Sequence, residues 1–140
     1  MYDTLLAKIQ TTLDATTGVE DAFNYPKTKF TAFPAVYFQP DGMSNSFETT
    51  TENYKVYRFL MMVIIGIEGS DEETVFGTVL PATVDNIIAQ FDTEWDQGTV
   101  NGHRVWAKID SADAWAISEE QDGRMAYAPL SLEIRVLTDT

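Results

Sequence analysis

The chain contains no cysteine, a single histidine and few basic residues. The lack of cysteine excludes a disulfide framework, a thiolate metal site and a cysteine nucleophile. Nine Lys and Arg residues stand against 22 Asp and Glu residues, which gives a net charge of −13. A surface of this sign repels phosphate groups and argues against wrapping of nucleic acid, although DNA could pass along the protein without being held.

The sequence also lacks an apolar run long enough to cross a bilayer as a helix. Its least polar run, residues 59–67, is interrupted only by Gly66, and its length is about half of the roughly 20 residues that a membrane helix needs. The N-terminus "MYDTLLAKIQ" has neither the cationic start nor the apolar stretch of a signal peptide. We therefore expect no membrane segment.

What remains is an ordinary globular composition. Hydrophobic residues make up 44% and charged residues 22% of the 140 residues, values typical of a folded soluble domain. The length suits one domain with a core of its own. No repeat or linker divides the chain, so we expect a single domain over residues 1–140.

The apolar run is predicted to be a strand. Within "NYKVYRFLMMVIIGIEG", residues 53–69, β-branched and aromatic residues predominate, as is typical of strands. Both alternating faces are apolar, so we expect both to be covered. One face carries Tyr54, Val56, Arg58, Leu60, Met62 and Ile64, and the other carries Tyr57, Phe59, Met61, Val63, Ile65 and Ile67. Helices of the same chain can cover one face; strand curvature and loops, or another subunit, can cover the second.

A helix, a short strand and a polar loop are predicted before this strand. Apolar residues recur at helical spacing over residues 2–13, and Gly18 ends that helix. "PAVYFQP", residues 34–40, predicts a short strand. The polar segment "DGMSNSFETTTE", residues 41–52, is interpreted as a projecting loop that contacts partners.

A second helix is predicted after the apolar strand. "SDEE" is a good helix start, with Ser70 as the cap and Glu73 three residues later to complete a capping box. Apolar residues then hold one helical face from Val75 to Phe91 and stay in phase across Pro81. We expect one helix kinked at Pro81, with two short helices as the alternative.

The C-terminal third is predicted to contain two half-buried strands. "HRVWAKI" and "LSLEIRV" alternate apolar with polar residues. Asp122-Gly123 is a turn signal between them, and Pro129 indicates a bulge or an edge position. Together the elements predict an α+β fold in the order α-β-β-α-β-β, with a mixed or antiparallel sheet of about four strands and two main helices packed on one face.

Residues that could carry chemistry stand apart from one another. His103 follows an Asn101-Gly102 turn signal and has no partner at metal-ligand or triad spacing. Residues 92–98, "DTEWDQG", lack the glycine and the terminal glutamate of a calcium loop. We expect no catalytic, cofactor or metal site.

The order of the elements and their sequences resemble those of the tail terminator (tail completion, minor tail or head–tail joining) proteins of long-tailed bacteriophages. A helix ends near "ATTGVE" and is followed by "FPAVYFQPDG", by "ENYKVYRFLMMVIIGIEG", by the acid-started helix and by a closing "PLSLEIRV". The resemblance covers nearly the whole chain and includes no catalytic signature. Neck and head-closure proteins of the same particles have related architectures and are the alternative.

The resemblance implies a structural virion protein without enzymatic activity. Proteins of this family form rings, commonly hexamers, that cap the tail tube and present a surface to the head connector or neck protein. The expected partners are therefore other copies of the chain, the tail tube protein and the connector, and the expected location is the virion, after assembly in the host cytoplasm. DNA would pass through the ring, and carboxylates along the lumen would repel its phosphates.

Six residues are candidates for self-assembly or partner contacts. They belong to the predicted loop and to the apolar strand, where two methionines on opposite faces offer adaptable packing. These residues are Phe47, Glu48, Glu52, Tyr54, Met61 and Met62.

Three other functions are weighed against this one. A small ligand-binding module would use Trp106, Trp115 and Tyr127 as an aromatic pocket. A hydrolase would need Asp110 and Asp113 as paired carboxylates. A basic and aromatic cluster of Tyr25, Lys27, Lys29 and Phe30 is too small to make a nucleic-acid site.

Overall fold

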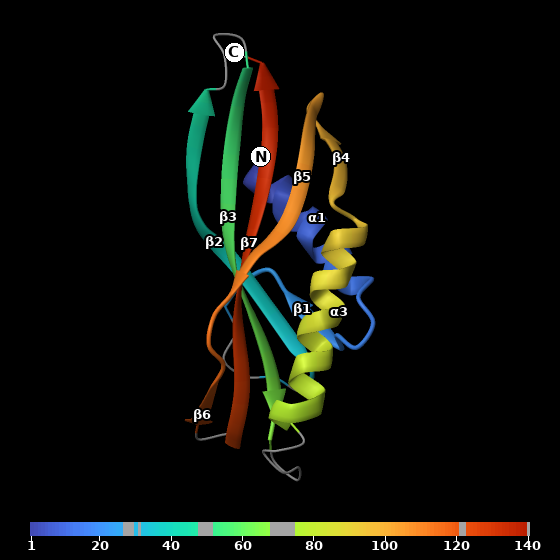
Figure 1. The fold of residues 1–140 in the computed structure, drawn as a ribbon, viewed down its shortest axis with the longest axis vertical. Helices are drawn as coiled ribbons and strands as arrows, with labels where there is room; N and C mark the ends of the chain where they lie inside the picture. Colours follow the sequence, from blue (N-terminus) through green and yellow to red (C-terminus); the bar gives the residue numbers. More distant parts are fainter. Residues whose placement is uncertain (27–29, 31, 48–51, 68–74, 121–122, 140) are drawn as a thin grey trace.

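The computed structural model describes residues 1–26, 30, 32–47, 52–67, 75–120 and 123–139, and sheet predominates among them. The helical elements are α1 (Tyr2–Asp14), the π-helical turn η1 (Val75–Val79) and α3 (Leu80–Thr93). The strands are β1 (Asp21–Phe23), β2 (Ala35–Phe47), β3 (Glu52–Gly66), β4 (Asp96–Val100), β5 (His103–Ala112), β6 (Ala116–Glu120) and β7 (Gly123–Asp139). Figure 1 shows long, strongly twisted strands with α1 and α3 beside them.

Within the described residues the strands form one seven-stranded sheet in the order β1-β2-β3-β7-β5-β4, with β6 paired to the start of β7, before the part that pairs with β5. β1 is parallel to β2, and all other neighbours are antiparallel. β3 and β7 lie in the middle and pair along the whole of β3, from Glu52 opposite Asp139 to Gly66 opposite Met125. This long central pair (Figure 1) sets the register of the rest of the sheet.

The predicted fold class is wrong. The structure is mostly sheet, curled into a half-barrel of seven strands with two helices, and not an α+β domain with four strands. Three short strands account for much of the difference: β1 has three residues, and β4 and β6 have five each. β4 reads "DQGTV", a polar sequence with a glycine, and tertiary pairing with β5 overrides its weak strand propensity.

The projecting loop predicted over residues 41–52 is largely strand. β2 continues to Phe47, and β3 begins at Glu52. Pro40 and Gly42, which suggested the end of a strand, instead mark a register shift between Pro40 and Met43, where Gly42 adopts a positive φ of 107°. Such bulges bend a strand without ending it. Residues 48–51 lie outside the described part of the chain.

The predicted helix runs across Pro81 without interruption, since Val79 keeps a helical conformation where η1 leads into α3. Pro81 stands in the first turn of α3, where its missing N–H is not needed for a helical hydrogen bond. The preceding turn, η1, is π-helical rather than α-helical. The predicted cap and capping-box residues, Ser70 and Glu73, lie outside the described residues. None of the helices described is both long and apolar enough to span a membrane.

The strand predicted from the apolar run is confirmed as β3, and its odd-numbered face forms the core with the two helices. The α1 residues Leu5, Ile9 and Leu13 and the α3 residues Leu80, Ile87 and Phe91 are buried, as are Phe59, Met61 and Val63 of β3. The ring of Tyr2 packs edge-on against Tyr57 with centroids 5.0 Å apart. Burial raises the pKa of the Tyr57 phenol, and the neighbouring Tyr2 adds to this effect.

The two adjacent methionines provide a test of which face of β3 is the core. Met61 is fully buried, whereas Met62 lies on the opposite, half-buried face. Met61→Ala is expected to lower the free energy of unfolding by about 2–5 kcal/mol, because it leaves a cavity in a closed core. The matched control, Met62→Ala, is expected to cost less than about 1 kcal/mol. Urea denaturation followed by circular dichroism measures both, and equal losses would contradict this assignment of the faces.

Candidate interaction surface on the outer face of the sheet

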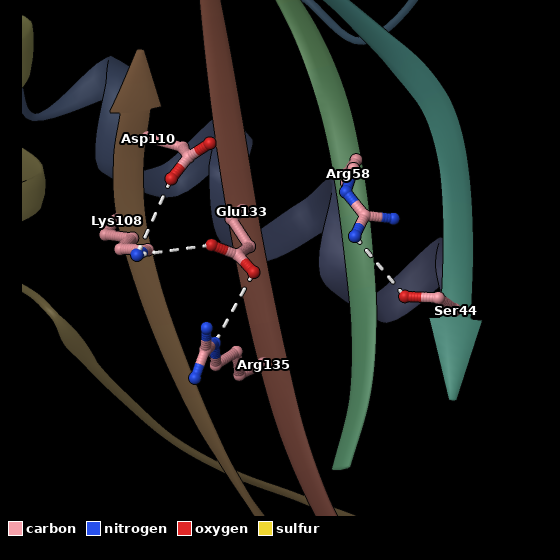
Figure 2. Close-up of polar contacts among 6 residues, drawn as sticks. All are labelled: Ser44, Arg58, Lys108, Asp110, Glu133 and Arg135. Atoms are coloured by element: carbon pink, nitrogen blue, oxygen red, sulfur yellow. Dashed lines mark hydrogen bonds and ion pairs between the residues drawn. The ribbon is translucent and has the colours of Figure 1, made fainter. Parts of the chain in front are cut away.

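The outer face of the sheet is the face turned away from α1. Side chains alternate along a strand, so burial of the odd-numbered residues of β3 under the helices places its even-numbered residues on the outer face. Figure 2 shows this face, with α1 lying behind the strands. On it, Arg58 is exposed, and Tyr54, Leu60 and Met62 are half-buried. Within the chain, the outer face is therefore covered less completely than the core face.

A row of charged residues crosses the middle of the outer face. Arg58, Glu133 and Lys108 are register neighbours on β3, β7 and β5. The Lys108 ammonium lies 3.4 Å from a Glu133 carboxylate oxygen and 3.6 Å from Asp110, and the Arg135 guanidinium lies 3.4 Å from the other Glu133 oxygen (Figure 2). Glu133 thus joins two cations on neighbouring strands.

On this row, Arg58 differs from the other cations in its partner. Its guanidinium donates a 3.3 Å hydrogen bond to the Ser44 hydroxyl on β2 (Figure 2). Among the contacts of the described residues, no carboxylate pairs with Arg58. Its charge is therefore available to an acidic group from outside the chain.

Aromatic side chains lie next to this row. Trp106 is the register neighbour of Arg135, its ring is 6.1 Å from that of Tyr54, and the Arg104 guanidinium lies 5.3 Å from its centroid. The arrangement of Arg104 and Trp106 is a cation–π contact. An open depression of about 370 Å³ is lined by Tyr54, Trp95, Trp106, Lys108 and Arg135. Trp95, at its rim, is 52% exposed.

We refer to these residues together as the aromatic–basic surface. It comprises Tyr54, Arg58, Trp95, Arg104, Trp106, Lys108 and Arg135. Four of the nine basic residues of the chain gather here, against three nearby acids, Asp96, Asp110 and Glu133. The local balance of four positive and three negative charges contrasts with the net charge of −13 of the whole chain. Tyr, Trp and Arg are the residues enriched at the centres of protein interfaces.

Beyond the charged row, the outer face becomes apolar. Leu60 and Met62 are half-buried there, and Tyr37 and Pro129 flank Met62 on β2 and β7. Farther along β3, the Phe33 ring lies so close to Gly66 that an added Cβ would meet it at 3.0 Å. The second face of β3 is therefore closed by the chain itself at one end and half-open in its middle.

The structure separates the six predicted contact residues. Tyr54 and Met62 lie on the outer face. Met61 was predicted as a contact, but it is fully buried in the core, so we withdraw that assignment. Phe47 and Glu52 end β2 and begin β3, and their side chains lie outside the described structure, as does the whole of Glu48.

The predicted aromatic pocket is not assembled. Trp106 lies opposite Arg135, whereas Tyr127 lies eight residues away along β7, a separation of roughly 26 Å. Trp115 packs against the hydrophobic core. Trp106 instead shares a depression with Tyr54 and Trp95. Tyr54 belongs to β3 and Trp95 to the loop before β4, and their spacing in the sequence does not predict that they meet.

The residues considered as candidates for catalysis or metal binding lie in turns and surface ion pairs. Asp110 is about half exposed and pairs with Lys108, and Asp113 is exposed. His103 follows the predicted Asn101-Gly102 turn, which is confirmed as the β4–β5 turn. In the described ranges no group of three or more His, Asp or Glu residues could hold a metal ion. Lys27 and Lys29 lie outside these ranges.

The sequence pattern predicts strands that carry most residues of the aromatic–basic surface, but it does not connect these residues to one another. It placed Arg104, Trp106 and Lys108 on the polar side of one strand and Glu133 and Arg135 on the polar side of another. The signal was present, because paired antiparallel strands bring polar sides of the same parity together. The missing information was the register, which places Trp106 opposite Arg135.

Comparison with known proteins identifies a fold but no family. No family model and no curated protein match the chain. A chain of a solved structure described as the virion of a native gene transfer agent (GTA) particle is similar, with a TM-score of 0.55, 16% identity, and coverage of 97% of this chain and 95% of that one. A second solved structure has the same coverage, 17% identity and a TM-score of 0.47. At this level of identity the first likeness shows that the two chains share a fold.

Removing single charges from the aromatic–basic surface is expected to leave the fold intact. Lys108→Met and Arg135→Met should each change the free energy of unfolding by less than about 1 kcal/mol, because exposed ion pairs contribute little and Glu133 keeps one cation in each variant. Urea denaturation measures both. A loss of several kcal/mol in either variant would show that the charged row is structural and not available to a partner.

Proposed function

We propose that this protein is a structural component of a tailed virion that completes the tail tube and joins it to the head connector as an oligomeric ring. The observation that carries the proposal is the fold shared with a chain of a gene transfer agent virion. The sequence resemblance to tail terminator proteins of long-tailed bacteriophages, reached independently of that comparison, points to the same class of particle.

The extent of the structural likeness supports a role for the whole chain. It covers 97% of this protein and 95% of the virion chain, so the likeness extends over nearly the whole of both chains and is not confined to one segment. Small virion proteins act through their surfaces, and this chain presents an open face rich in Tyr, Trp and Arg side chains. Such a face fits a building block with no reaction of its own.

The charge of the chain supports a role beside passing DNA. With a net charge of −13, most of its surface repels phosphates. A ring of such subunits would let DNA move through without holding it. The partners we propose are other copies of the chain, the tail tube protein and the head connector or neck protein, all within the virion.

The proposal is tested by disrupting the gene in the strain that produces the particle. Electron microscopy of the lysate is expected to show filled heads and separate tails of uneven length, because no ring ends the tube or joins it to the head. Wild-type protein supplied from a plasmid should restore complete particles. An Arg135→Met copy is expected to fold, so a defect seen with this copy would be due to the altered surface and not to loss of the protein.

The same images distinguish the alternatives. Tails of normal length together with heads that have lost their DNA would instead indicate a neck or head-closure protein. Complete, infectious particles in the absence of the gene would contradict a structural role in the virion.

A further inference from the structure

We infer that the aromatic–basic surface of one copy docks on an acidic surface formed by α1, α3 and the turn after α1 of the next copy. This inference rests on the proposed ring and specifies how its subunits meet. The acidic helix surface comprises Asp14, Glu20, Asp85 and Asp92, all of which are exposed.

The acids of this surface come from α3 and from the end of α1, two elements that a hydrogen bond joins. Asp85 and Asp92 are seven residues apart on α3 and therefore lie on one face of that helix. The neighbouring Asn86 side chain donates a 3.1 Å hydrogen bond to the Thr17 carbonyl, which holds the end of α1 beside α3. Lys8, the basic residue of α1, uses its ammonium to bond the Gln97 carbonyl at 2.7 Å. The acids of this surface thus have little basic compensation from the helices.

The two surfaces cannot meet within one copy. The helices pack on the core face of the sheet, and the aromatic–basic surface lies on the outer face, with α1 behind the strands in Figure 2. A contact between the outer face of one copy and the helices of the next uses both surfaces of every subunit. Such a heterologous contact produces a ring when the rotation closes, and it brings a surface with four cations against a surface whose charged residues are all acidic.

The chemistry of the aromatic–basic surface suits an acidic protein partner. Arg58 has a hydroxyl and not a carboxylate as its partner in the chain, and the side chains of Arg104, Lys108 and Arg135 are each about half exposed. These cations can orient an approaching carboxylate surface. Trp95 and Trp106 offer flat apolar area at the same place, which is where most of the binding strength of an interface arises.

Charge exchange between the two surfaces tests the inference. The first variant carries Lys108→Glu and Arg135→Glu, and the second carries Asp85→Lys and Asp92→Lys. Each is expected to weaken self-association at least tenfold, because the first variant makes both docking surfaces acidic and the second removes the net negative charge of the acidic helix surface. An equimolar mixture should associate again, because either surface of one variant complements the other surface of its partner in an alternating ring.

The mass of the assembled protein is measured by sedimentation equilibrium of the full chain at about 50 mM and at about 500 mM salt. Screening at the higher concentration should weaken the association of the wild type. The control, Asp41→Lys with Asp113→Lys, makes the same change in charge as the second variant at exposed residues outside both surfaces. It is expected to associate at least as well as the wild type. Circular dichroism confirms that every variant is folded.

A parallel measurement in the virion decides the question if the wild-type chain assembles only on the tail. Each variant alone should fail to restore particle titre to the gene-disrupted strain, and co-expression of both should restore it. Variants that assemble like the wild type, or a pair that fails to complement in both measurements, would overturn the docking arrangement. That result would leave the proposed virion role standing, since the disruption phenotype judges it separately.

Discussion

The antiparallel pairing of β3 with β7 is the constraint on which the rest of the structure depends. The two strands stay in register from Glu52 to Gly66, and the core face of this ribbon packs against the helices. Because side chains alternate, a slip of one residue would exchange the two faces. Phe59 and Met61 would then face outward, and the Arg58 charge would enter the core. The hydrophobic residues of the core face therefore fix which side chains the outer face presents.

The outer face has a character that differs from the rest of the molecule. A chain with 22 acidic residues concentrates four of its nine basic residues there, beside the exposed Trp95 and the half-buried Tyr54 and Trp106. Copies of such a chain repel one another in general, so a contact between copies depends on a local surface of opposite sign. The same distribution keeps most of the surface unattractive to DNA. This distribution of charge is thus compatible with both the proposed assembly and the proposed passage of DNA.

The sequence was informative where hydrophobic patterns are long and regular. The strand from Tyr54 onward, the N-terminal helix and the two C-terminal alternating strands are all present, because burial of many apolar residues determines them. The predicted four-stranded α+β fold was wrong because β1, β4 and β6 are short, and β4 is also polar. Pro40 and Gly42 indicate the end of a strand in the sequence, yet they form a bulge within β2. Long-range register also had to come from the structure, since spacing alone did not place Trp106 opposite Arg135 or Tyr54 beside Trp106.

The central claim is that the outer face of the sheet is covered by protein in the assembled particle. Oxidative footprinting by mass spectrometry tests it directly, by comparing the free chain with intact virions. Trp106 and Met62 are partly accessible in the free chain, and Met61, which is fully buried in the core of the chain, serves as the internal reference. The account predicts that oxidation of Trp106 and Met62 falls at least fivefold in the virion while Met61 stays protected throughout. Equal oxidation of Trp106 and Met62 in the free chain and in the virion would contradict it.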